Sequence, residues 1–312
     1  MNVMVTGAGL VGCHVARELA QGGHRVVLYD VAPNEAYIRR VAGDLPAVRG
    51  DIRDLPALMD VMQDHQVDTV FHSAALIGSN VAEHPYTGLN VNIGGAIAVA
   101  EAGRLRGIRR LVYASTVGVY SRSQVSAATI TEESPIGGAA FYPSSKVACE
   151  QVLRAYGAHY SFELAILRFA GVYGYGHYLG GSTIGKNMHG LVTSIREGGP
   201  VRIDSQHFFT NEYVYVKDVA QGVVLGCEKP LPSDTFNIGT GVISSAADLA
   251  EAVRTVRPEV QVELGESSTA PSRPNRSQPM DLARARQELG YNPRFDLAEG
   301  IEDFIEELQR EG

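Results

Sequence analysis

The chain opens on Val3-Met4-Val5-Thr6-Gly7-Ala8-Gly9-Leu10-Val11-Gly12, and this stretch decides the fold. The four residues before Gly7 are apolar or β-branched, as in a buried strand. Val11, Val15 and Leu19 then recur at helical spacing. The sequence therefore predicts a strand, a glycine turn and a helix in immediate succession.

The turn has the spacing G-x-G-x-x-G, which binds the pyrophosphate of a dinucleotide when a strand precedes it and a helix follows. Gly7 permits the tight turn, Gly9 lets the backbone approach the pyrophosphate, and Gly12 lets the helix pack closely on the strand. Leu10 and Val11 open the helix, whose free N–H groups and dipole favour a phosphate. We therefore expect these five residues to bind the cofactor.

Acidic and small residues at the ends of the next strand-like runs specify the cofactor further. Asp30 ends the second run, where a carboxylate accepts both ribose hydroxyls of an adenosine and repels a 2′-phosphate, so NAD is favoured over NADP. Asp51, in Gly50-Asp51-Ile52, ends a short third strand that comes before the run at 69–72, and an adenine is expected beside it. Ala74 and Ala75 follow the fourth, where small side chains let a flat cofactor pass.

Strand-like and helix-like segments alternate through the first two thirds of the chain. The strand-like runs are residues 3–6, 25–30, 69–72, 110–114 and 164–167, and the helical stretches include 55–62, 87–106 and 142–158. This alternation predicts an α/β fold, a Rossmann-type doubly wound parallel sheet with a smaller C-terminal α/β substrate-binding domain. We expect the NAD-binding domain at 1–170 plus about 211–240, and the substrate-binding domain at about 171–210 and 241–312.

Composition excludes several classes of function. The 312 residues include 27 Lys and Arg against 35 Asp and Glu, and this net charge of −8 argues against binding to nucleic acid or to anionic membranes. The three scattered cysteines favour a reducing compartment. No apolar run approaches the ~20 residues that span a bilayer, and no signal peptide is visible, so we expect a cytoplasmic protein. The histidines and cysteines show no metal-binding spacing, so no metal is expected.

A second constellation points to proton transfer. Tyr142 and Lys146 are four residues apart, so on a helix they share one face. An ammonium group there, near a nicotinamide cation, lowers the tyrosine pKa and lets the phenol exchange a proton with a substrate hydroxyl. Ser115 and Thr116 place two hydroxyls at the carboxyl end of a strand, where open α/β sheets bind ligands. We expect Thr116 to hold the substrate oxygen and Ser115 to face the cofactor.

These motifs together resemble the extended short-chain dehydrogenase/reductases, in the epimerase/dehydratase branch to which UDP-galactose 4-epimerase belongs. The resemblance covers nearly the whole chain. The matching segments are 50–54 (GDIRD), 72–75 (HSAA), 92–95 (NIGG), 114–120 (ASTVGVY), 142–146 (YPSSK), 215–220 (YVKDVA) and 236–241 (FNIGTG). They are specific for fold and cofactor and much less specific for the substrate.

The resemblance implies roles for individual residues. Thr116 takes the place of the catalytic Ser/Thr, Tyr142 that of the acid/base, and Lys146 that of the tyrosine's partner and nicotinamide-ribose ligand. Phe169 falls where the family packs a side chain near the nicotinamide, and Asn92 at an asparagine beside the active site. The family also implies a homodimer formed by the helices near 87–106 and 142–158.

Departures from the family pattern bear on the substrate. The glycine turn is one residue shorter than T-G-x-x-G-x-x-G, and Val117 and Gly118 replace the acid pair of 4,6-dehydratases, so that reaction is not expected. Gly171 stands where an Asn is common, and Asn211 where an Arg opens a substrate-binding motif. Arg273 matches an arginine that contacts diphosphate in relatives. We take Thr116, Gly171, Asn211 and Arg273 as the substrate-binding positions.

The leading hypothesis is an NAD-dependent epimerase of a sugar, preferably a nucleotide sugar, that oxidises a secondary alcohol and returns the hydride. An NAD-dependent dehydrogenase of a free sugar, sugar acid or other hydroxy compound uses the same residues and remains an alternative. A non-catalytic NAD-binding protein needs only the glycine turn. The Tyr- and Gly-rich segment 173–178 is expected either to line a sugar site or to pack as a hinge.

Overall fold

The computed structural model describes residues 1–138, 140–160, 162–176, 181–265 and 278–310. Seven strands form a sheet in the order β10-β6-β5-β4-β1-β2-β3, and every neighbouring pair is parallel. The strands are β1 (Asn2–Thr6), β2 (Arg25–Asp30), β3 (Ala47–Arg49), β4 (Thr69–His72), β5 (Arg110–Thr116), β6 (Glu163–Phe169) and β10 (Thr235–Ile238). The doubly wound parallel sheet predicted from the sequence is confirmed.

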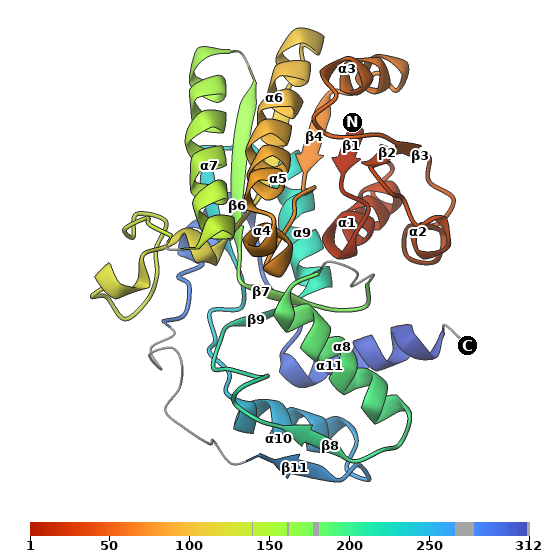
Figure 1. Ribbon diagram of the computed structural model, residues 1–312, viewed down its shortest axis with the longest axis vertical. Helices are drawn as coiled ribbons and strands as arrows, with labels where there is room; N and C mark the ends of the chain where they lie inside the picture. Colours follow the sequence, from red (N-terminus) through yellow and green to blue (C-terminus); the bar gives the residue numbers. More distant parts are fainter. Residues whose placement is uncertain (139, 161, 177–180, 266–277, 311–312) are drawn as a thin grey trace.

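Helices cover both faces of this sheet (Figure 1). One core packs the sheet against α3 (Leu55–Asp64), α6 (Gly95–Arg106) and α7 (Phe141–His159). The other packs it against α1 (Leu10–Gln21), α2 (Glu35–Ala42) and α9 (Val216–Glu228). The central strands are buried on both faces, which is why their sequences are nearly continuous apolar runs rather than alternating ones.

The remaining elements lie beyond the carboxyl edge of the sheet (Figure 1). They are β7 (Gly171–Tyr173), α8 (Thr183–Arg196), β8 (Val201–Ile203), β9 (Tyr213–Tyr215), α10 (Ala246–Val256), β11 (Val262–Leu264) and α11 (Leu297–Gln309). A capping box between Asp296 and Glu299 starts α11. The apolar residues Ile301 and Phe304 of this helix are fully buried. The strand order reverses between β1 and β4, so a ligand crevice is expected at the carboxyl ends of these strands.

The helical stretch predicted near 87–106 is confirmed, and it contains one irregular turn. It begins in α5 (Pro85–Leu89), which follows the short helix α4 (Ser79–Glu83), and a π-helical turn, Asn90–Gly94, separates α5 from α6. The side chain of Asn92, within this turn, is buried and bonded to the backbone of Leu76. Such turns often lie at functional sites.

Within the described ranges, no helix is long and apolar enough to cross a membrane. The same part of the chain contains no group of three or more His, Cys, Asp or Glu residues that could hold a metal ion.

Candidate active site

The glycine turn joins β1 to α1 at the carboxyl edge of the sheet. Gly7 has a φ of +90°, and a Cβ on it would lie 2.8 Å from the backbone nitrogen of Ala74. A Cβ on Gly12 would lie 1.8 Å from the carbonyl oxygen of Gly7. A Cβ on Gly9 would meet no atom within 4 Å. Two glycines are therefore required by packing inside the protein, and the third borders open space.

This turn fits a dinucleotide. Helix α1 begins at Leu10 with no side-chain cap, so its first N–H groups are available beside the open space at Gly9. The Asp30 carboxylate accepts hydrogen bonds from the backbone N–H groups of Ala8 (2.7 Å) and Ala32 (2.8 Å), which holds it at the rim of the turn. A carboxylate with two oxygens retains further acceptor sites for ribose hydroxyls.

Gly12→Ala is expected to lower both the thermal stability and the NAD affinity, the latter by more than about tenfold, because the added methyl collides with main-chain oxygen that cannot rotate away. Thermal melts without NAD and NAD titration by calorimetry measure the two effects. Gly9→Ala is the matched control, since its methyl enters space that the protein leaves open. It should keep the melting temperature and lose NAD affinity. A Gly12→Ala variant with normal NAD binding would refute the assignment of the turn.

The other predicted cofactor residues lie at the ends of neighbouring strands. Asp51 follows β3, and its carboxylate pairs with the Arg53 guanidinium at the surface. Arg53 holds the pKa of the Asp51 carboxyl below its usual range. Ile52 is buried and lies where a Cβ on Gly95 of α6 would be, and Ala74 and Ala75 are half-buried after β4.

The predicted proton-transfer residues occupy adjacent elements. Thr116 ends β5 and is the register partner of Phe169, which ends β6 and is buried. Tyr142 and Lys146 lie in the first turns of α7. The Lys146 ammonium donates a hydrogen bond to the Ala114 carbonyl at 2.7 Å and lies 5.8 Å from the centre of the Tyr142 ring. Strand β5 and helix α7 thus bring these groups to one edge of the sheet.

Burial disfavours the charged forms of both Tyr142 and Lys146. It raises the pKa of Tyr142 and lowers the pKa of Lys146 to about 8, although Cys149 and Glu150 oppose the shift at Lys146. In the protein by itself, desolvation is the larger effect on the Tyr142 pKa. The expected lowering of this pKa, which involves the nicotinamide cation together with Lys146, stays a prediction.

The hydroxyl of Ser115 does not face the site, contrary to the expectation from the sequence. Ser115 is buried, and its Oγ donates to the Glu150 carboxylate at 2.6 Å. Glu150 is fully buried and forms an ion pair with the buried Arg168 of β6, at 2.6 Å. Arg154 also contacts Glu150, at 3.3 Å. This network joins the ends of β5 and β6 to α7 one helical turn beyond Lys146.

Asn92 lies beneath the first turn of α7. Its amide nitrogen donates to the Leu76 carbonyl and to the Ser145 hydroxyl, both at 3.0 Å, and its oxygen accepts from the Leu76 N–H at 2.8 Å. The Ser145 hydroxyl donates in turn to the Tyr142 carbonyl at 2.7 Å. Asn92 therefore links the loop after β4 to the turn that carries Tyr142, and its side chain is used within the protein.

The two departures at 171 and 211 are packed against each other. A Cβ on Gly171 would lie 2.4 Å from the Asn211 amide nitrogen. That nitrogen donates to the Glu212 carbonyl at 3.1 Å, and Asn211 is buried. The Asn211 amide nitrogen is therefore bonded inside the protein, and the expected contact of Asn211 with substrate stays a prediction. Arg273, the other predicted anchor, lies outside the described residues.

The described part of the Tyr- and Gly-rich segment, residues 173–176, is closely packed. Tyr173 and Tyr175 are buried, and the Tyr173 hydroxyl lies where a Cβ on Gly300 of α11 would be. Of the two expectations for residues 173–178, the described part therefore supports packing, while residues 177 and 178 lie outside the described ranges.

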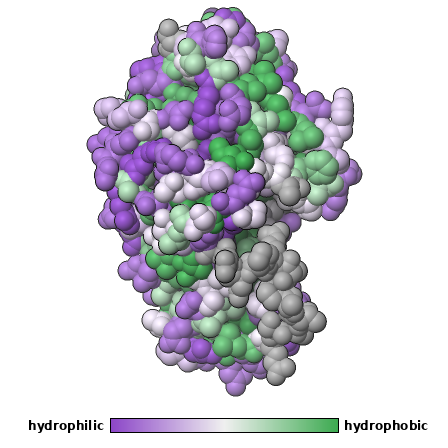
Figure 2. All heavy atoms as spheres, turned by 90° about the vertical axis from the view of Figure 1, so that its left-hand side faces the viewer, coloured by the Kyte–Doolittle hydropathy of each residue, from purple (hydrophilic) through white to green (hydrophobic). Residues whose placement is uncertain are grey.

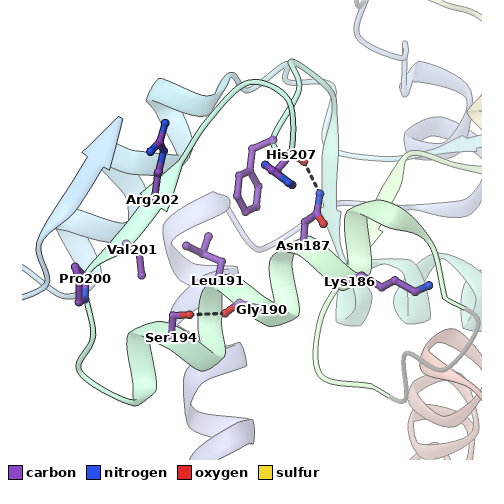
Figure 3. Close-up of a pocket in the computed structure, with 10 residues that line it drawn as sticks. Lys186, Asn187, Gly190, Leu191, Ser194, Pro200, Val201, Arg202 and His207 are labelled. Carbon is purple, nitrogen blue, oxygen red and sulfur yellow. Dashed lines mark hydrogen bonds between the residues drawn. The ribbon is translucent and has the colours of Figure 1, made fainter. Parts of the chain in front are cut away.

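A separate pocket of about 290 Å³ lies between α8 and the segment that contains β8 (Figure 3). Lys186, Asn187, Leu191, Arg202 and His207 are among the residues that line it, and Thr116, Tyr142 and Lys146 are not. The Lys186 and Arg202 side chains point in different directions, away from the pocket centre (Figure 3). The pocket is therefore distinct from the expected proton-transfer site.

Sequence reasoning missed two groups of residues around the site. Glu150 has a local signal, since it follows Lys146 at the same helical spacing that separates Lys146 from Tyr142. His14 and Tyr37, which bond to Tyr175, have no such signal because their partner is far along the chain.

Comparison with known proteins identifies the class to which this fold and site belong. The sequence model described as the NAD dependent epimerase/dehydratase family matches residues 3–239. The chain belongs to this family. The family confirms the predicted NAD-dependent enzyme and the predicted resemblance.

The individual relatives are similar along nearly their whole length. The chain is 30% identical to the UDP-glucose 4-epimerase of Mycolicibacterium smegmatis over 98% of both chains, and 28% identical to that of Bacillus subtilis over 97% of this chain and 95% of the relative. A crystal structure of UDP-glucose 4-epimerase from Stenotrophomonas maltophila, with bound NAD and formylated UDP-arabinopyranose, superposes with a TM-score of 0.83 at 27% identity over 100% of both chains.

Proposed function

We propose that this protein is an NAD-dependent nucleotide-sugar epimerase and that its substrates are UDP-hexoses. The observation that carries the proposal is the hydrogen bond from Lys146 of α7 to the Ala114 carbonyl of β5, the strand that ends at Thr116. The whole-chain similarity to UDP-glucose 4-epimerases supports the choice of substrate.

The proposed chemistry assigns one task to each side chain. The Thr116 hydroxyl orients the sugar hydroxyl, and the Tyr142 oxygen removes its proton and later returns it. The Lys146 ammonium stabilises the phenolate and contacts the nicotinamide ribose. The glycine turn and Asp30 would hold NAD, which would supply the hydride acceptor for oxidation of the sugar and the hydride donor for its reduction.

The packing of Gly171 against Asn211 favours a second candidate. Neither position presents a group for bidentate phosphate binding, a task suited to arginine. A net dehydrogenase of a free sugar or sugar acid would need no such group. We propose that the segments 171–210 and 241–312 hold the substrate in either case, with Arg273 as the phosphate or carboxylate ligand.

Incubation with UDP-glucose or UDP-galactose distinguishes these functions. An epimerase is expected to convert each sugar to the same equilibrium mixture, as followed by proton NMR, without net NADH absorbance at 340 nm. A dehydrogenase would instead accumulate NADH with free sugars or uronic acids and leave the nucleotide sugars unchanged. Absence of both reactions in NAD-loaded protein would contradict the proposed catalytic function.

We further propose a homodimer formed through α6 and α7. Ile97 and Leu105 of α6 are exposed, as is Tyr160 at the end of α7. In Figure 2, which faces the side of the molecule that carries α7, hydrophobic residues interrupt a mainly hydrophilic surface in the upper half.

The three cysteines are free thiols, which supports a reducing, cytoplasmic location.

A further inference from the structure

The segment after β7 is bonded to the nucleotide-binding half of the molecule through one backbone oxygen. The Tyr175 carbonyl accepts a hydrogen bond from His14 Nε2 of α1 at 2.8 Å and another from the Tyr37 hydroxyl of α2 at 3.3 Å. His14 and Tyr175 are 161 residues apart in sequence, and both are buried. We name these two hydrogen bonds the Tyr175 clamp.

The protonation of His14 is defined by its surroundings. A carbonyl can only accept, so Nε2 carries the proton, while Nδ1 accepts from the Arg17 guanidinium at 3.2 Å. Burial, with Arg17 acting in the same direction, lowers the pKa of His14 to about 4. The imidazole is therefore neutral near pH 7 and has one proton, which the clamp uses.

Packing reinforces the clamp on both sides of Tyr175. The Arg40 guanidinium lies over the Tyr175 ring, 5.2 Å from its centre, and the rings of Tyr37 and Tyr175 are 6.0 Å apart. A Cβ on Gly176 would lie 2.6 Å from Leu10 Cδ1 and 3.0 Å from the Tyr37 hydroxyl. Glycine at 176 thus lets the backbone lie directly on the first turn of α1.

Leu10 connects this contact to the cofactor site. It is the first residue of α1, and it follows Gly9, where the turn borders open space. Tyr175 and Gly176 therefore lie against the flank of α1, with Gly176 at the same helical turn whose N–H groups are expected to hold the pyrophosphate.

We infer that the Tyr175 clamp holds Tyr175 and Gly176 against the first turns of α1 and thereby slows the release of NAD, with His14 as the principal positioning residue. The inference deepens the proposed function and rests on it. An epimerase must keep one NAD through both hydride transfers, whereas a net dehydrogenase must release NADH. The clamp provides a physical basis for retention that the catalytic residues themselves do not.

The test measures NAD exchange in the absence of substrate, so it stays readable even if epimerisation fails. Protein loaded with isotopically labelled NAD is chased with unlabelled NAD, and the label that remains bound is followed with time. His14→Leu removes the shorter bond and is expected to accelerate release about tenfold, the equivalent of one buried hydrogen bond. Tyr37→Phe removes the longer bond and should have a smaller effect. His14→Gln places an amide donor near Nε2 and should restore slow exchange.

Tyr291→Phe is the matched control, because it deletes a buried hydroxyl bonded to the Gly239 carbonyl at 2.8 Å, outside the clamp. It should exchange NAD at the wild-type rate. The inference is overturned if His14→Leu exchanges at the wild-type rate, or if Tyr291→Phe accelerates exchange equally, which would indicate general loosening. Should His14→Leu fail to fold, Tyr37→Phe decides between faster release and no change.

Discussion

Tyr142→Phe is expected to reduce turnover on the order of 10²–10⁴-fold while NAD binding stays at its wild-type level. The substitution removes only the phenolic oxygen, which is the proposed proton acceptor and donor. The ring remains beside the Lys146 ammonium, so packing at the start of α7 is retained. Turnover is measured by the interconversion assay and NAD affinity by calorimetry on the same preparation.

Tyr156→Phe provides the control on the same helix, with the same loss of one hydroxyl at a half-buried position. It should keep full activity. A Tyr142→Phe enzyme that turns over at the wild-type rate would contradict the assignment of Tyr142 as acid and base. Loss of NAD binding together with turnover would show that the residue acts through the cofactor site.

Glu150→Gln is expected to destabilise the fold by about 3–5 kcal/mol, because it leaves the buried Arg168 guanidinium without its counter-charge. Glu150 accepts from Ser115 and Arg168 together, so the variant also weakens the bond between β5 and α7. The free energy of unfolding from chemical denaturation measures the effect.

Two controls separate charge pairing from other causes. Glu150→Gln combined with Arg168→Met removes both charges and should recover much of the loss, because neutral replacement of a buried ion pair is often tolerated. Glu251→Gln breaks an exposed pair with Arg254 and should change stability little. If Glu150→Gln were as stable as Glu251→Gln, the buried pair would not support the site as described.

Much of the cofactor site could be predicted because its signals are local. A glycine turn between an apolar run and a helical stripe specifies its own geometry, and Tyr142 and Lys146 share a helix face at any position in a fold.

The features that the sequence did not predict depend on contacts between separate elements. The sequence placed Ser115 and Thr116 together at a strand end, but only the packing of β5 against α7 shows that the Ser115 hydroxyl points to Glu150. Likewise, the sequence predicted the helical stretch 87–106 but not its π-helical turn, in which Asn92 bonds to the loop after β4. Both outcomes depend on partners contributed by another element.

By itself, therefore, the sequence determined the sheet class, the glycine turn, the preference for NAD and the pairing of Tyr142 with Lys146, since each depends on spacing within a short segment. Only the tertiary structure decided which side chains remain available to a ligand. Asn211 is engaged against Gly171, and His14 is held to Tyr175, a residue far along the chain. Such pairings depend on which strands and helices become neighbours, and the folded chain sets them through packing between elements.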